Sequence, residues 1–287
     1  MDRLPSTQIR EMQKQELAFA AECTAAEGWM SENKATLEGF YLKDPKGCLL
    51  AEEKGQPVGI CVTTFYGNCG FIGELIVRPE ARGRGVGAEL LRHGVRILKD
   101  RGAETIYLDG VVKAVALYER NEFNKVCRSW RFSGQLAGKP SLHVRHMTVS
   151  DLDQVNALDR LSFGADRSFF LGRRFELFPE HSLVMLDGER VSGYILGSSG
   201  ESWISAGPWV VKEDAENPLE LLSAFALTAG GRPISIGILE TNHRACDIVR
   251  RLGFRERSDS PWRMAMGSSS DLGASPRCYA VGSAAKG

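Results

Sequence analysis

The sequence predicts an α+β fold, in which a mixed, mostly antiparallel sheet is flanked by helices, and it predicts two such domains in tandem. The first observation is the order of elements, because extended segments joined by short turns give way to alternating helices and strands. The second is that this order starts again after residues 133–140, which have the composition of a linker. The third is a gapless match between residues 117–123 and residues 248–254. An internal repeat of domain size explains all three.

The first half of the chain begins with a short strand and two helices, which stop near Gly28 and at the Asp-Pro-Lys-Gly turn of residues 44–47. Three strands follow, and residues 54–57 form a hairpin-like connection between the first two. A helix, a strand, a helix and a strand then complete the half. The expected elements are strand 9–12, helices 15–26 and 35–42, strands 48–52, 58–65 and 71–77, helix 85–100, strand 105–108, helix 113–121 and strand 125–132.

The second half repeats this plan. Its first helix has a capping residue at Ser150 or Asp151, and Leu152, Val155, Leu158 and Leu161 recur on one face. The expected elements are strand 142–147, helix 151–163, strands 182–186, 191–196 and 203–211, helix 219–228, strand 234–239, helix 244–252 and a short docked strand at 278–281. We expect one domain at residues 1–137 and a second at residues 138–287.

Composition excludes several classes of protein. The 287 residues suffice for two domains with separate cores, and 36 basic residues balance 36 acidic residues. That balance argues against a nucleic-acid or membrane partner. No apolar segment is typical of a signal peptide or a membrane span, so we expect a cytoplasmic protein. The seven cysteines are scattered without ligand spacing, so we expect reduced, buried side chains, no disulfide framework and no metal site.

The glycine-rich turn at residues 82–87 is the most informative local motif. It reads Arg-Gly-Arg-Gly-Val-Gly and lies between a hydrophobic strand and an amphipathic helix. Glycine lets a backbone approach a ligand closely, and the first amides of a helix have no partners within the helix. The positive end of the helix and two arginines would therefore suit a pyrophosphate.

A purely structural role is the alternative for this turn, and two other phosphate-binding motifs do not match it. Glycines between a strand and a helix also serve tight packing alone, and short motifs often match by chance. The turn lacks the Gly-Lys-Ser/Thr ending of a P-loop, and it does not follow the Gly-x-Gly-x-x-Gly pattern of a dinucleotide-binding turn. An anion site and a purely structural turn both stay open on these residues alone.

A wider set of residues resembles the GCN5-related N-acetyltransferase (GNAT) superfamily, with two such domains in tandem. In the first half the strand ending in Glu-Leu-Ile-Val-Arg-Pro at 74–79 leads into Arg82-x-x-Gly85-x-Gly87. Leu-Tyr-Glu-Arg at 117–120 and Phe123 then follow in the order that the superfamily uses. In the second half, residues 203–209 and 242–254 resemble the C-terminal domain of two-domain acetyltransferases.

The resemblance implies an N-acetyltransferase that passes the acetyl group of acetyl-CoA directly to a primary amine of a small molecule or peptide. It maps pyrophosphate binding to the glycine-rich turn at residues 82–87, here called the signature loop, and it maps pantetheine pairing to the preceding strand. Tyr118 matches the general acid that would protonate the leaving thiolate, and a backbone amide near Val77 would stabilise the oxyanion. The implied cofactor residues are Ile76, Val77, Arg78, Arg82, Gly83, Arg84, Gly85, Val86, Gly87 and Ala88.

The superfamily uses different residues, or water, as the general base, so the resemblance does not identify one residue. Glu74 is the first candidate, because a regularly alternating strand would bury it beside Ile72 and Ile76 and raise its pKa. Asp109, at the end of the neighbouring strand, is the second candidate. Either carboxylate could instead be structural or bind the acceptor. Where relatives have Leu-Gly, this chain has Asn121-Glu122, so we expect that turn to shift by one residue.

The second domain lacks both features of a cofactor site. Residues 212–218 contain three carboxylates and no glycine where the anion loop should be, and Val249 replaces Tyr118. We therefore expect a degenerate domain that packs beside the first, as a monomer or homodimer, with Trp203, Trp209 and Trp262 in the acceptor cleft or in the core. A non-catalytic acyl-CoA sensor and a scaffold protein are the alternative functions.

Overall fold

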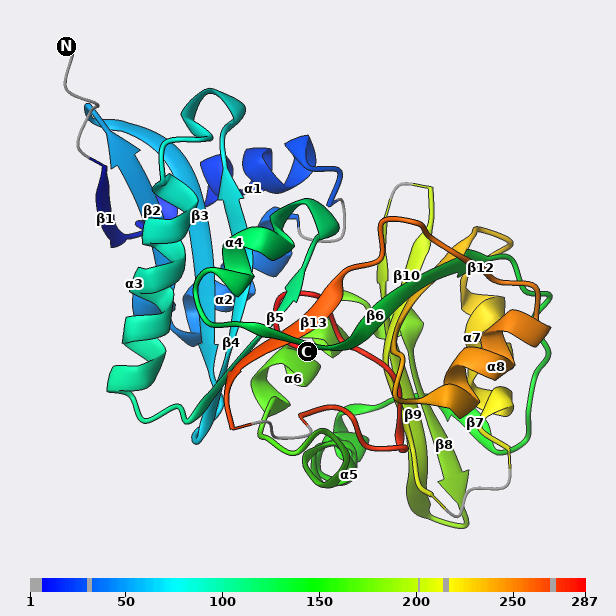
Figure 1. The fold of residues 1–287 in the computed structure, drawn as a ribbon. Coiled ribbons are helices and arrows are strands. Elements are labelled where there is room, and N and C mark those ends of the chain that lie inside the picture. The colour runs from blue at the N-terminus through cyan, green and yellow to red at the C-terminus, as the bar shows by residue number, and fades with distance from the viewer. Residues whose placement is uncertain (1–6, 30–32, 201, 214–216, 269–271) are drawn as a thin grey trace.

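The computed structural model describes residues 7–29, 33–200, 202–213, 217–268 and 272–287 (Figure 1). Within these residues the chain forms eight α-helices and one 14-stranded sheet. The first half contains β1 Gln8–Glu11, α1 Leu17–Ala26, α2 Lys34–Lys43, β2 Cys48–Glu53, β3 Gln56–Phe65, β4 Cys69–Val77, α3 Val86–Asp100, β5 Thr105–Gly110, α4 Val115–Glu119 and β6 Asn124–Gly134.

The second half repeats the order and has two strands more. It contains β7 Val144–His146, α5 Leu152–Phe163, α6 Ser168–Leu177, β8 Ser182–Asp187, β9 Arg190–Ser199, β10 Ile204–Val211, α7 Leu219–Thr228, β11 Ile234–Leu239, α8 His243–Arg251, β12 Arg255–Glu256, β13 Trp262–Gly267 and β14 Cys278–Ala280. The predicted mixed, mostly antiparallel sheet is confirmed, because among the described strands only β4 with β5 and β10 with β11 pair in parallel.

The two halves exchange strands at the centre of the sheet. The strand order is β1-β2-β3-β4-β5-β13-β6-β11-β10-β9-β8-β7, so β13 of the second half lies between β5 and β6 of the first. β6 runs from one half to the other and pairs with β13 along its first part and with β11 along its second (Figure 1). The sheet is therefore continuous across the predicted boundary after residue 137, which stays a prediction.

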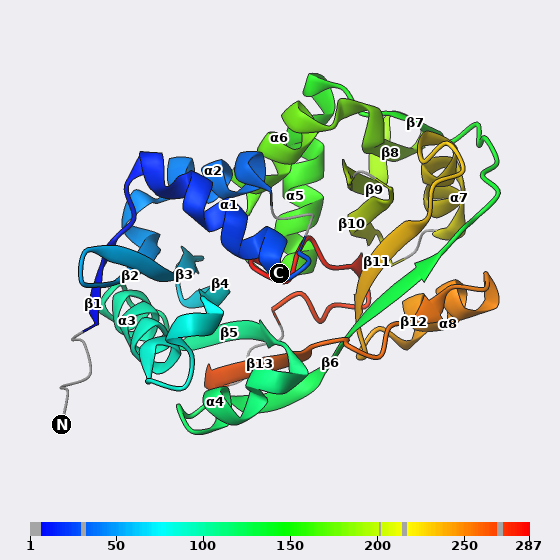
Figure 2. The same ribbon diagram turned by 90° about the horizontal axis from the view of Figure 1, so that it is seen from above.

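Helices cover both faces of each half of the sheet. Seen from above, α1 and α2 lie on one side of strands β1 to β4 and α3 lies on the other (Figure 2). Apolar residues on one face of α3, including Leu90, Leu91 and Leu98, are fully buried against these strands. The core beneath α1 and α2 also contains Phe163 and Phe170 from the second half, so this hydrophobic core is shared by both halves.

Most predicted elements agree with the observed ones to within a few residues, and the short strand predicted near residues 278–281 is confirmed as β14. Three elements were missed, α6, β12 and β13. Leu161 was wrongly placed on the buried face of its helix, because its side chain is 74% exposed. β13 carries no local signal of its partners, since both neighbours come from the other half of the chain.

The parallel strands of each half separate after a short paired region. β4 and β5 pair from Cys69 with Thr105 to Ile72 with Leu108, and the later parts of both strands diverge. β10 and β11 pair over three residues and diverge after Ala206 and Ile236. Each half thus contains one V-shaped opening between its two parallel strands. Both openings face the centre of the molecule, where the C-terminus also lies (Figures 1 and 2).

Candidate functional site

A cleft of about 880 Å³ follows the opening between β4 and β5 and continues to the second half. Its lining includes the signature loop, the end of β4 and Tyr118 from the first half. The second half contributes Trp203, Ser205 and Ser235, together with the C-terminal segment of residues 281–285. Sequence-distant elements therefore converge on one cavity that joins the predicted cofactor site to the other half of the chain.

The signature loop has the geometry that an anion site requires. Gly83 and Gly85 have positive φ angles of 75° and 90°, which residues with a side chain rarely adopt. A Cβ added to either glycine would meet nothing within 4 Å, so the backbone here is open. α3 begins at Val86, directly after Gly85, so its first amides face the cleft that the loop lines. The residues present thus fit a pyrophosphate, because the backbone is open and the helix end is positive.

Two of the predicted cofactor residues do not line this cleft. Arg84 forms an ion pair with the buried carboxylate of Glu53, at 2.9 Å. The amide of Arg78 donates to Val58 O at 2.8 Å, and its guanidinium pairs with Glu22. Both arginine side chains form ion pairs outside the lining of the cleft, so their role as cofactor ligands stays a prediction. The other predicted residues of this set line the cleft: Ile76, Val77, Arg82, Gly83, Gly85, Val86, Gly87 and Ala88.

Glu74 lies in a bulge that redirects β4. Ile76 pairs with Ile60 and Gly73 pairs with Val62, so Glu74 and Leu75 together oppose Cys61 alone. Glu74 has a φ of 48° and is 4% exposed, and it lines the cleft. The prediction of regular alternation along β4 was wrong, because the bulge interrupts it. The buried carboxylate instead reaches the cleft through this local irregularity.

Tyr118 occupies the position that the motif predicts. It lies on α4, is 7% exposed and lines the cleft, and its ring packs edge-on against Phe123 at a centroid distance of 6.3 Å. Gly110 makes room for the ring, because a Cβ there would lie 2.8 Å from it. Burial raises the pKa of the Tyr118 phenol well above its ordinary value. The hydroxyl therefore stays protonated at neutral pH.

The turn after Tyr118 is not shifted, contrary to the prediction. Glu122, not Asn121, adopts the left-handed conformation, with a φ of 68°. Its aligned counterpart in the second half, Gly253, has a φ of 83°. Asn121 stabilises the helix end instead, since its side chain donates to Leu117 O at 2.8 Å. The turn follows the geometry of a glycine-containing one at the cost of a strained glutamate.

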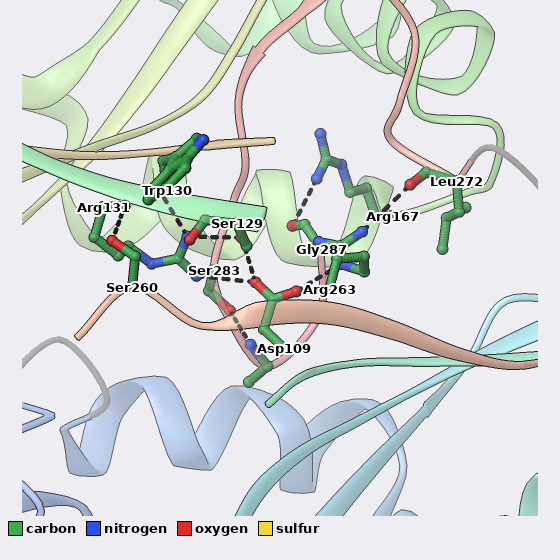
Figure 3. Close-up of polar contacts among 11 residues, drawn as sticks. Asp109, Ser129, Trp130, Arg131, Arg167, Ser260, Arg263, Leu272, Ser283 and Gly287 are labelled. Carbon is green, nitrogen blue, oxygen red and sulfur yellow. Dashed lines mark hydrogen bonds and ion pairs between the residues drawn. The ribbon is translucent and has the colours of Figure 1, made fainter. Parts of the chain in front are cut away.

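Asp109 is held in a buried ion-pair network rather than presented as a base (Figure 3). Its carboxylate accepts from Arg263 Nε at 2.5 Å, Arg131 Nη2 at 2.9 Å and Ser129 Oγ at 2.8 Å. Although burial alone would raise it, the two guanidinium groups lower the pKa of Asp109 below its ordinary value. A carboxylate that is ionised and fully occupied is a poor proton acceptor, so we correct its candidacy as the general base.

The corresponding opening of the second half is filled by the chain itself. β14 pairs with β10 at Trp209 and Val210, beyond the point where β10 leaves β11. Val281 N then donates to Gly237 O of β11 at 2.8 Å. Val249, the counterpart of Tyr118, is fully buried in the apolar core. Of the acidic loop at 212–218, residues 214–216 lie outside the described residues.

The far wall of the cleft was largely missed from the sequence. The C-terminal segment of residues 281–285 packs so closely on β4 that a Cβ on Gly73 would lie 2.5 Å from Ala285. Of the three tryptophans, Trp203 lines the cleft, while Trp209 is fully buried against Tyr279. Trp262 packs in the core of the first half and contacts Arg128. Local sequence could not place this wall, because a strand exchange and a folded-back terminus build it.

All seven cysteines are buried and free, and burial raises the pKa of Cys48 to about 12. Among the described residues, no cluster of three histidine, cysteine, aspartate or glutamate side chains could hold a metal ion. None of the described helices has the length and apolar character to cross a membrane.

Sequence comparisons agree with this geometry. The acetyltransferase (GNAT) family matches residues 9–123, and an acetyltransferase (GNAT) domain matches residues 155–280. The chain belongs to the GNAT superfamily and carries two of its domains in tandem.

Individual relatives are more distant. The mycothiol acetyltransferase of Stackebrandtia nassauensis is 37% identical over 107 residues, which are 34% of this chain and 35% of that protein. The chain thus matches about a third of that relative's length.

Two solved structures share the fold. A Pyrococcus horikoshii protein provisionally described as an acetyltransferase superimposes with a TM-score of 0.81 at 24% identity, over 100% of this chain and 99% of its own. A tandem GNAT protein from the clavulanic acid biosynthesis pathway has a TM-score of 0.63 at 14% identity, over 92% of this chain and 100% of its own.

Proposed function

We propose that this protein transfers the acetyl group of acetyl-CoA directly to a primary amine of a small molecule or peptide. The observation that carries the proposal is the single cleft that unites the open loop at Gly83 and Gly85, the diverging end of β4 and the buried Tyr118. The similarity of this chain to the mycothiol acetyltransferase also supports an acetyl-transfer reaction. The loop would hold the pyrophosphate, and the end of β4 would pair with the pantetheine arm.

In the proposed reaction, the amine nitrogen bonds to the thioester carbonyl carbon and the carbon–sulfur bond breaks. The amine loses one proton, for which Glu74 is the candidate acceptor, directly or through water. The departing sulfur gains one proton from the Tyr118 hydroxyl, and solvent later returns a proton to Tyr118. A backbone amide near Val77 would stabilise the oxyanion. Tyr118 suits its role because its phenol is protonated at neutral pH and lines the same cleft as the end of β4.

The two halves would divide the work. Residues 1–137 would bind acetyl-CoA, and residues 138–287 would shape the acceptor end of the cleft and bind no cofactor. β14 and Val281 support this division, because they take the place beside β10 and β11 that the pantetheine arm would need. Trp203 and the serines at 205 and 235 are then among the second-half side chains available to an acceptor, together with Arg174, Arg257 and Asp259.

The test is release of coenzyme A thiol from acetyl-CoA in the presence of a panel of primary amines. We expect at least one amine to give turnover with the wild type. Tyr118→Phe keeps the ring packing but lacks the proton donor, so kcat should fall about 100-fold while the Kd for acetyl-CoA stays within twofold. Tight binding of acetyl-CoA without turnover on any amine would argue for an acyl-CoA sensor instead.

A further inference from the structure

The mouth of the cofactor opening is crossed by a three-residue ion-pair bridge. Glu27, at the C-terminal end of α1, forms an ion pair through one carboxylate oxygen with Arg82 of the signature loop. Its other oxygen accepts from Lys113 Nζ at 2.7 Å, in the turn directly after β5. Arg82 follows β4 and Lys113 follows β5, so one carboxylate links the two sides of the opening. All three residues line the cleft.

The environment of Glu27 makes this bridge unlike an ordinary surface ion pair. The glutamate side chain is 13% exposed, whereas the side chains of Arg82 and Lys113 are 45% and 67% exposed. Glu27 is the residue that follows the last turn of α1, and the negative C-terminal end of the helix dipole disfavours a carboxylate there. The two cations offset this penalty and the cost of burial, and they keep the pKa of Glu27 below its ordinary value.

The two cations have the chemistry of a phosphate site. Arg82 and Lys113 both contact one small anionic group already, and they line the same cleft as Gly83 and Gly85. A phosphate is an anion with several acceptor oxygens, and arginine and lysine are its usual side-chain ligands. A phosphate group that binds this pair must displace the Glu27 carboxylate, because its negative charge would otherwise be repelled.

We propose that Lys113 and Arg82 together bind a phosphate of coenzyme A, and that Glu27 competes with that phosphate for both cations. The proposal rests on the proposed function, since it concerns the same cofactor site. Glu27 would act as an internal counter-anion that lowers cofactor affinity and discriminates against weaker anions. Cofactor entry would then include opening of the bridge, and the measured affinity would be reduced by the fraction of molecules in which it is closed.

The experiment measures the Kd of coenzyme A by titration calorimetry, without any acceptor amine. Glu27→Gln removes the competing charge but keeps the size of the side chain, so we expect coenzyme A to bind about three- to tenfold more tightly. Lys113→Ala should weaken binding by a similar factor. In the double variant, Glu27→Gln should improve affinity by less than it does alone, because one of its two partners is gone.

A matched control is available on α4. Glu119 forms a carboxylate–lysine pair with Lys125 at 3.1 Å outside the cleft lining, so Glu119→Gln should leave the Kd unchanged. Thermal melts of each variant verify folding, and Glu27→Gln should lower Tm only slightly, because the ion pairs that it removes are partly exposed. Dephospho-coenzyme A identifies the phosphate involved. Lys113→Ala affects its binding if the pyrophosphate is the ligand, and spares it if the 3′-phosphate is.

Two results would contradict the proposal that Glu27 competes with a phosphate for Arg82 and Lys113. If Glu27→Gln weakens or does not change coenzyme A binding, Glu27 organises the site or is uninvolved, and it does not compete. If Lys113→Ala leaves the Kd of coenzyme A unchanged, Lys113 is no ligand. A wild type that binds coenzyme A with the expected variant effects but acetylates no amine would refute the proposed function and leave the bridge standing. A wild type that binds no coenzyme A refutes both.

Discussion

Replacement of Asp109 separates a structural role from a catalytic one. Its side chain is fully buried and is the common acceptor for two arginines, one on β6 and one on β13. Arg263 is 2% exposed and Arg131 is 16% exposed at the side chain, so water can replace little of what the carboxylate provides. Removing one partner of a buried ion pair leaves an uncompensated charge and typically costs about 3–5 kcal/mol.

Asp109→Asn should therefore lower the free energy of unfolding by about 3 kcal/mol, because the amide keeps the shape but loses the charge. The expected fall in Tm is about 6–12 °C. Urea unfolding followed by circular dichroism measures the first quantity, and calorimetry the second.

Catalysis is then measured well below the new Tm. If Asp109 has only a structural role, the kcat of folded Asp109→Asn should stay within a few-fold of the wild-type value. The reasoning is refuted if Asp109→Asn keeps wild-type stability and loses activity, because that pattern belongs to a general base. Ser129→Ala is the milder control, since it leaves both charges in place and removes a hydroxyl that donates to the same carboxylate and accepts from Arg131, each at 2.8 Å, and it should cost about 1–2 kcal/mol.

Two further predictions concern stability. Glu122 holds a left-handed conformation with a φ of 68°, so Glu122→Gly should stabilise the fold by about 1 kcal/mol in urea unfolding. An unchanged or lower stability would contradict the strain. Asp151 has a pKa of about 2, below its ordinary 3.8, because Arg145 and the Thr148 amide bind its charged form. Its contribution to stability is complete above about pH 4 and is lost as the pH falls toward 2. Asp151→Asn should therefore lower stability by about 1–2 kcal/mol at pH 7 and flatten the acid side of the stability profile.

Local sequence was sufficient for most of the elements and for one end of the cleft. The turn at 82–87 predicts an open, positive helix start because glycine and helix geometry are local properties, and the structure places Gly83, Gly85 and Val86 on the cleft. Tyr118 was located by its resemblance to the superfamily motif, and the structure places it on the cleft. Where local preference and tertiary packing disagreed, packing prevailed: the bulge reoriented Glu74, and Glu122 was forced into a conformation that favours glycine.

The sequence by itself determined two repeats of an acetyltransferase fold and which of them keeps the anion loop and the tyrosine. Only the tertiary structure decided how the repeats are joined, because β13 and β14 find partners that are distant along the chain. It assigned Asp109 to an ion-pair network, since Arg263 reaches it only when β13 lies beside β5. It also linked Glu27 to Arg82 and Lys113 across the cofactor opening. Such contacts depend on long-range strand order and side-chain packing, which residue spacing does not encode.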